Sequence, residues 1–144
     1  MNATQAPRML FVNIAVRDLQ RAREFFTALG FAFDARFSGE TGACMVLEER
    51  HSYVMLLTEP FFQTLAGRAP CDAQQHIEAI LCLSCESRAA VDTLVENALR
   101  LGARAAHPPE DHGFMYSRPF YDLDGHAWNI LWMDQSAVPP PPAG

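Results

Sequence analysis

The side chains best suited to chemistry gather near the end of the chain, around one carboxamide in an apolar stretch. Residues 127–133, AWNILWM, hold Asn129 among large apolar side chains. A strand turns alternate side chains to opposite faces, so Asn129 shares a face with Leu131 and Met133. A carboxamide both donates and accepts hydrogen bonds. Asn129 could therefore bind a polar ligand group, or bond a neighbouring amide or a buried water instead.

Three further candidates precede that stretch: His112 in a loop, then Tyr116 and Arg118 in the aromatic run 114–121. An arginine among aromatic residues can bind a carboxylate or phosphate through two parallel hydrogen bonds. It can equally pair with a nearby carboxylate of its own chain, or stack on a ring at an interface. Which face of this run points inward follows from Asn129, and a one-residue shift in strand register would reverse the answer.

Cys82 and Cys85 form a C-x-x-C sequence. On a strand, residues three apart point to opposite faces, so this pair cannot jointly bind zinc or form a redox disulfide. We interpret both as core thiols. We interpret the other four histidines as turn or strand-end residues; they are His51, His76, His107 and His126. The sequence has no glycine-rich phosphate loop and no Gly-x-Ser-x-Gly motif.

Length and charge narrow the class of protein. The 144 residues carry a net charge of −6 without a basic run, which argues against a nucleic-acid partner and mildly favours a cationic small molecule. No apolar stretch reaches the roughly 18 residues of a membrane helix, and the N-terminus lacks the order of a signal peptide. We therefore expect a cytoplasmic protein without membrane contact, whose four cysteines are reduced.

The elements that must position these residues form a pattern that occurs twice. The first half predicts a strand, a helix from Asp18 to Gly30 and three more strands, at residues 9–16, 31–37, 43–48 and 52–58. The second half predicts the same order with a helix from Ser87 to Gly102 and strands at residues 76–85, 103–107, 114–121 and 126–133. The Asp-Gly pair before the last strand indicates a hairpin. Residues 60–75 form a connector with a short helical turn, and residues 135–144 a disordered proline-rich tail.

Two segments carry a family resemblance. LFVNIAVRDLQRAREFFTALGF (Leu10–Phe31) and FYDLDGHAWNILWM (Phe120–Met133) resemble the opening and closing signatures of the vicinal oxygen chelate superfamily. That superfamily includes glyoxalase I, bleomycin resistance proteins, fosfomycin resistance enzymes and extradiol dioxygenases. The resemblance covers about residues 8–134 and is closest to a branch of predicted glyoxalase-like proteins.

The resemblance implies an α+β fold. Two tandem β-α-β-β-β modules, residues 8–59 and 76–134, would curl their mixed sheets into cups that form a shared cavity within a single domain, residues 1–144. The resemblance also implies a homodimer.

The resemblance further implies four metal-binding positions, on the first and last strand of each half, where His, Gln and Glu are usual. The matched residues here are Asn13 and Cys82 on the first strands, and Asn129 with either Val54 or Met55 on the last. A divalent metal needs anionic or strongly donating ligands, so we expect no metal cofactor. The iron ligands of extradiol dioxygenases and the carboxylate base of glyoxalases are both missing from these positions.

Two functions are therefore open. The first is a protein that binds a small organic molecule in an apolar cavity without the usual metal, as the bleomycin resistance branch does. Its candidate ligand-binding residues are Asn13, Cys82, His112, Tyr116, Arg118 and Asn129. The alternative is a glyoxalase-like lyase or isomerase of the lactoylglutathione lyase type, with a non-standard site that uses His112, Tyr116 or Arg118.

Overall fold

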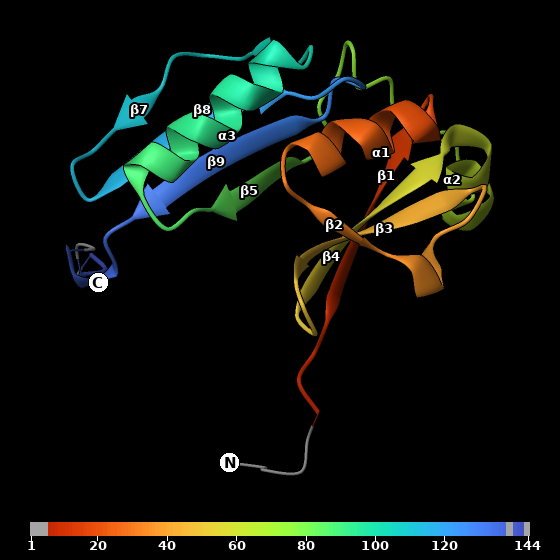
Figure 1. The fold of residues 1–144 in the computed structure, drawn as a ribbon, viewed down its shortest axis with the longest axis horizontal. Helices are drawn as coiled ribbons and strands as arrows, with labels where there is room; N and C mark the ends of the chain where they lie inside the picture. The colour runs from red at the N-terminus through yellow and green to blue at the C-terminus, as the bar shows by residue number, and fades with distance from the viewer. Residues whose placement is uncertain (1–5, 138–139, 143–144) are drawn as a thin grey trace. The chain divides into compact units, whose positions relative to one another are not determined.

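The computed structural model describes residues 6–137 and 140–142, and the chain divides into two compact units between Pro70 and Cys71 (Figure 1). Each unit contains its own mixed sheet and a long helix that packs on that sheet. None of the helices in the described ranges has the length and apolar character needed to cross a membrane.

The first unit has a four-stranded sheet in the order β1-β4-β3-β2, in which β1 runs parallel to β4 and the other pairs are antiparallel. Its elements are β1 (Leu10–Val16), α1 (Leu19–Ala28), β2 (Ala32–Asp34), the 3-10 turn η1 (Ala35–Phe37), β3 (Gly42–Glu48), β4 (Ser52–Thr58) and α2 (Glu59–Ala66). The helix α1 begins where the Asp18 carboxylate accepts the backbone N–H of Arg21 at 3.1 Å. It packs on β3 and β4 and buries Phe25 and Phe26.

The second unit repeats that strand order as β5-β9-β8-β6, with β5 parallel to β9 and with β7 paired to β8. Its elements are β5 (Ile80–Ser84), α3 (Arg88–Arg100), β6 (Arg104–Ala105), β7 (Glu110–Asp111), β8 (Met115–Tyr121), β9 (Ala127–Met133) and the 3-10 turn η2 (Gln135–Ala137). The Ser87 hydroxyl accepts the N–H of Ala90 and begins α3. The helix packs on β8 and β9, where it buries Val91 and Val95.

The predicted α+β class and the repeated β-α-β-β-β order are confirmed, but some bounds are wrong. The strand predicted at residues 31–37 ends at Asp34, because the Asp34 carboxylate accepts the N–H of Arg36 and turns the chain into η1. The strand predicted at 76–85 begins at Ile80, because the N–H groups of Gln75 and His76 bond to Asp72 in a turn. The loop after the predicted strand 103–107 contains the short strand β7.

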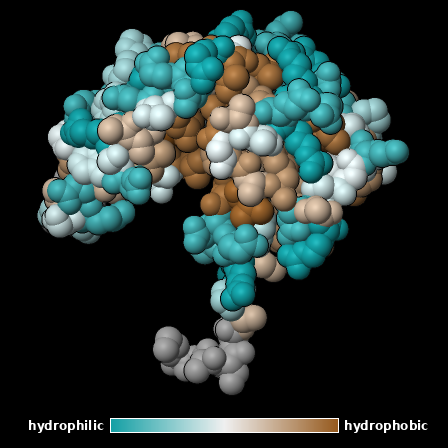
Figure 2. All heavy atoms as spheres, viewed as in Figure 1, coloured by the Kyte–Doolittle hydropathy of each residue, from teal (hydrophilic) through white to brown (hydrophobic). Residues whose placement is uncertain are grey.

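The connector contains the helix α2 where the sequence predicts a short helical turn. The helix α2 contacts β1 and β4, so most of the connector belongs to the first unit. The predicted disordered tail begins with η2, and its residues 138–139 and 143–144 lie outside the described ranges. The shared cavity involves both units and stays a prediction. The face drawn in Figure 2 carries both hydrophilic and hydrophobic areas. Among the described residues, the exposed large apolar side chains are Met9, Leu10, Phe11, Phe37, Leu65, Ile77 and Ile80.

A buried carboxylate holds the hairpin between β8 and β9. Asp122, only 5% exposed, accepts the backbone N–H groups of Asp124 (2.9 Å) and His126 (3.0 Å) and the indole N–H of Trp128 (2.9 Å). Its burial raises the pKa of this carboxyl above the usual value. The turn also needs Gly125, whose φ is +94° and whose Cα faces the carbonyl oxygen of Ala73. Asp122 therefore supplies a side chain that caps this turn.

Candidate functional site

Asn129 and Cys82 lie side by side in the second sheet. The register pairs Cys82 of β5 with Asn129 of β9, and Asn129 in turn with Pro119 of β8. Paired residues point to the same side of a sheet. We call this side the Asn129 face; it also carries Leu131 and Met133 of β9.

The carboxamide of Asn129 is the unusual feature of this face. Its Oδ1 atom is buried and accepts no hydrogen bond from any described residue. A buried acceptor without a donor costs about 1–3 kcal/mol relative to a solvated one. Its paired neighbour Pro119 has no backbone N–H to offer. The Cys82 thiol on the other side is exposed, so the interpretation of Cys82 as a core thiol is wrong. The Asn129 face therefore contains a buried hydrogen-bond acceptor that no described residue satisfies.

Tyr116 and Arg118 lie on the opposite side of the same sheet, against α3. Arg118 pairs with Ile130, the residue after Asn129, so its side chain points away from the Asn129 face. The Tyr116 hydroxyl donates to Oδ1 of Asp92 at 2.6 Å. Arg118 donates to Asp92 through Nη1 at 3.0 Å, and its Nη2 lies 2.8 Å from Oε1 of Glu96. These contacts join helix to sheet.

The polar contacts between α3 and β8 also change two pKa values. The hydrogen bond from the Tyr116 hydroxyl, with that from Arg118, lowers the pKa of the Asp92 carboxyl. The same bond to Asp92 raises the pKa of Tyr116. The protonated phenol and the ionised carboxylate are therefore each favoured by this pairing, which strengthens the contact between helix and sheet.

His112 lies in the turn between β7 and β8 and does not join Asn129 either. Its Nε2 is 3.3 Å from Oε2 of Glu110, and its side chain is more than half exposed. Next to it, the Arg88 guanidinium bonds both carboxylate oxygens of Asp111, at 2.7 and 3.0 Å. This contact lowers the pKa of Asp111 to about 2. The guanidinium also lies over the ring of Trp132, 5.0 Å from its centre.

The sequence reasoning missed this row of helix residues. Arg88, Asp92 and Glu96 stand four residues apart on α3, and each one bonds a side chain of the adjacent strands. Such spacing places side chains along one helix face. That spacing was the available signal that Arg118 and Tyr116 have partners within the chain.

The equivalent row of the first sheet contains Asn13. The register joins Asn13 of β1 to Met55 of β4, and Met55 to Cys44 of β3. When the two halves are aligned at their helix starts, Asn13 corresponds to Cys82. Asn13 is the strand partner of Met55, and Cys82 is that of Asn129, so Met55 rather than Val54 corresponds to Asn129. The Asn13 amide is exposed and donates to the carbonyl of Phe11 at 3.3 Å.

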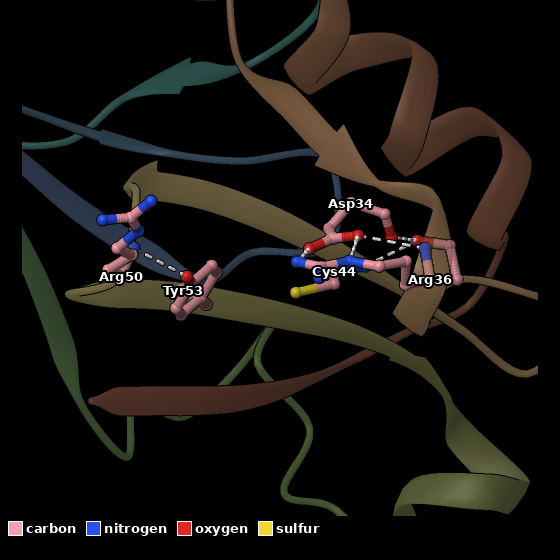
Figure 3. A network of polar contacts seen from close by, with 6 residues as sticks. Asp34, Arg36, Cys44, Arg50 and Tyr53 are labelled. Carbon is pink, nitrogen blue, oxygen red and sulfur yellow. Dashed lines mark hydrogen bonds and ion pairs between the residues drawn. The ribbon is translucent and has the colours of Figure 1, made fainter. Parts of the chain in front are cut away.

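A polar network extends the Asn13 row at the other edge of this sheet (Figure 3). Asp34 is the register partner of Cys44, and its carboxylate bonds the guanidinium of Arg36 at 2.8 and 3.1 Å. The Ser38 hydroxyl donates to the Asp34 carbonyl and accepts the N–H of Cys44. Burial raises the pKa of the Cys44 thiol. These bonds all lie within the first unit, which indicates a structural role.

The four matched positions do not fit a hard divalent cation. They supply the carboxamides of Asn13 and Asn129, the thioether of Met55 and the thiol of Cys82. None of these is a carboxylate or an imidazole, and a hard cation gains too little from a neutral amide to lose its hydration. Within the described ranges, no three His, Cys, Asp or Glu side chains are grouped so that they could hold a metal ion.

Comparison of the chain with known protein families supports this architecture. The sequence pattern of the Glyoxalase/Bleomycin resistance protein/Dioxygenase superfamily matches residues 8–130, so the chain belongs to that superfamily. The resemblance found in the sequence is thereby confirmed. Comparison with curated proteins finds no significant match.

Several solved structures share the fold. A hypothetical protein from S. aureus is 26% identical, with a TM-score of 0.73 over 87% of this chain and 92% of that one. A glyoxalase/bleomycin resistance protein/dioxygenase family enzyme from Burkholderia phytofirmans PsJN is 19% identical, with a TM-score of 0.70 over 85% of this chain and 96% of that one. A glyoxalase-related enzyme from Fulvimarina pelagi is 16% identical, with a TM-score of 0.73 over 87% of each chain.

Proposed function

We propose that this protein binds a small organic molecule at the Asn129 face, without the divalent metal usual in its superfamily. The observation that carries the proposal is the buried Oδ1 atom of Asn129, which has no donor among the described residues. A ligand that donates a hydrogen bond to this atom would remove the cost of leaving it unpaired. The apolar side chains of Leu131 and Met133 would contact the rest of the ligand.

The charge distribution points to a cationic ligand. Residues 71–144 carry ten carboxylate side chains against four arginines, so the whole net charge of −6 belongs to the second unit. The first 70 residues carry seven of each sign. A negative potential attracts cations and raises their local concentration. An ammonium group is also a strong donor, so the proposed ligand is an apolar molecule with a protonated amine.

The test compares three molecules of similar size: 2-phenylethylammonium, 2-phenylethanol and 3-phenylpropanoate. Calorimetric titration should give the tightest binding for the ammonium, weaker binding for the alcohol and none for the carboxylate, which has no donor at neutral pH. Asn129→Leu should weaken binding of the ammonium by about tenfold or more, the loss expected for one hydrogen bond to a charged group. Asn129→Asp should strengthen it.

A matched control is available on the opposite face of the sheet. Asp92→Asn removes a carboxylate beside Tyr116 and leaves the Asn129 face unchanged. It should reduce the affinity for 2-phenylethylammonium far less than Asn129→Leu does. Equal affinities for the three molecules, or wild-type affinity in Asn129→Leu, would contradict the proposal.

An enzymatic alternative rests on His112, Tyr116 or Arg118, and no contact of these side chains favours it. Tyr116 and Arg118 bond the carboxylates of α3, and His112 lies beside Glu110. None of the three lies on the face of Asn129. We therefore propose binding rather than glyoxalase-like catalysis. The homodimer and the cytoplasmic location remain predictions from the sequence; the sedimentation mass of the purified protein would test the former.

A further inference from the structure

A break in the sheet of the second unit opens a small cavity beside α3. The outer edge of β8 pairs with β6 at Phe120 and Tyr121 and with β7 at Tyr116 and Ser117. Between these pairs, the four residues 106–109 stand opposite only two residues of β8 and leave the sheet. Prolines have no backbone N–H, and Pro108, Pro109 and Pro119 all occur at this point. The sequence itself therefore prevents a continuous ladder here.

The cavity has a volume of about 280 Å³. It is lined by Val95 and Leu99 of α3, by residues 105–109, and by Arg118 and Pro119 of β8. Binding sites for small molecules usually measure about 300–1,000 Å³, so this cavity suits a molecule of fragment size. Most of its lining is aliphatic, and its polar side chains are those of His107 and Arg118.

Arg118 gives the cavity a directional polar group. Its side chain is 16% exposed, and Asp92 and Glu96 engage its Nη1 and Nη2. A guanidinium has five N–H groups, so the contacts within the described residues leave donors unused. The two carboxylates already balance the positive charge, and a ligand carboxylate would meet their repulsion. The remaining donors therefore favour a neutral acceptor, such as a carbonyl oxygen.

We propose that this cavity binds a small neutral carbonyl compound, whose oxygen accepts a hydrogen bond from Arg118 and whose apolar body contacts Val95 and Leu99. Arg118 points away from the Asn129 face, so this site is separate from the proposed function and does not depend on it. A carboxylate or phosphate of a ligand was one of the partners that the sequence left open for Arg118; the pairing with Asp92 and Glu96 favours a neutral ligand instead.

The test is a titration with cyclohexanone, followed through the methyl resonances of Val95 and Leu99 in 1H–13C NMR spectra. We expect both sets of methyl signals to shift and to saturate at millimolar ligand. Cyclohexanecarboxylate, a carboxylate probe of similar size, should bind at least about tenfold more weakly. Ala106→Phe should abolish the shifts by filling the cavity, with Ala105→Phe as a second variant that fills it from the neighbouring position.

Each outcome decides the proposal. Absence of saturable methyl shifts in the wild-type protein, or shifts of wild-type size in well-folded Ala106→Phe and Ala105→Phe, would overturn the site. Tighter binding of the carboxylate would overturn the ligand class. Asn129→Leu should bind cyclohexanone as the wild-type protein does. Loss of cyclohexanone binding in Asn129→Leu would show that the two sites are not separate, whereas the failure of the amine titration alone would leave this proposal standing.

Discussion

The stability of the second unit should depend strongly on Asp122, the buried carboxylate of the hairpin between β8 and β9. Asp122→Ala removes the acceptor of three N–H groups, two from the backbone and one from the indole of Trp128. The indole is the most shielded of the three, because Trp128 is only 2% exposed. The substitution should therefore remove a hydrogen bond from a shielded indole N–H to a charged acceptor.

The magnitude follows from these contacts. The loss of a buried hydrogen bond to a charged group costs about 1.5–3 kcal/mol, and the bonds of the two loop N–H groups, which water can reach in part, add less. The variant no longer has to bury a carboxylate. The free-energy cost of that burial, which also raises the pKa of Asp122, therefore offsets part of the loss. We expect Asp122→Ala to lower the free energy of unfolding by about 2–3 kcal/mol.

Urea unfolding followed by circular dichroism should measure this loss. A double-mutant cycle with Trp128→Phe, which has no indole N–H, should give a coupling energy of about 1 kcal/mol or more. Glu78→Ala, at an exposed carboxylate, is the control and should stay within about 0.5 kcal/mol of the wild-type protein. A loss in Asp122→Ala no larger than that in Glu78→Ala, or the absence of a coupling energy between Asp122 and Trp128, would refute the stabilising role of the Asp122 carboxylate.

Three further predictions use the same unfolding assay. Gly125→Ala should lower the free energy of unfolding more than Gly113→Ala does. Both glycines have a positive φ, but a Cβ at position 125 would lie 2.5 Å from the carbonyl oxygen of Ala73, whereas position 113 is open. Equal losses would contradict this. Asp111→Asn should lower the free energy of unfolding at neutral pH, and this deficit should shrink as the pH falls from about 4 toward 2. The reason is that Arg88 lowers the pKa of Asp111 in the folded protein to about 2, so the stabilisation is lost when Asp111 is protonated. A deficit that does not change with pH would refute the pairing. Val91→Ala should lower the free energy of unfolding by about 2 kcal/mol, because Val91 is fully buried between α3 and the sheet. A loss below about 0.5 kcal/mol would contradict this packing.

The sequence was sufficient for the architecture because periodicity and helix caps carry that information. Asp18 and Ser87 cap the two helices as expected, and the two halves repeat the same strand order. Local side-chain contacts that end an element were harder to predict. The bond from the Asp34 carboxylate to the N–H of Arg36 stops β2 after three residues, and alternation alone does not reveal it.

The candidate site was predicted in part. The sequence identified Asn129 as a polar residue in an apolar strand. The structure places Cys82 beside it and gives its Oδ1 atom no donor among the residues that it describes. The sequence could not decide the face of Arg118, because that depends on the register between β8 and β9. The carboxylates that pair with Arg118 lie on α3, more than 20 residues away in the chain.

The most direct test of the proposed function follows the side-chain amide resonances of Asn129 by NMR in two titrations of the wild-type protein. The first adds 2-phenylethylammonium, and the second adds Mn2+, a paramagnetic ion that broadens the signals of its ligands. We predict saturable shifts of the Asn129 signals with the ammonium, and no selective broadening of these signals at stoichiometric Mn2+. Selective broadening by Mn2+ without a response to the ammonium would show that Asn129 serves a metal site and would contradict the account.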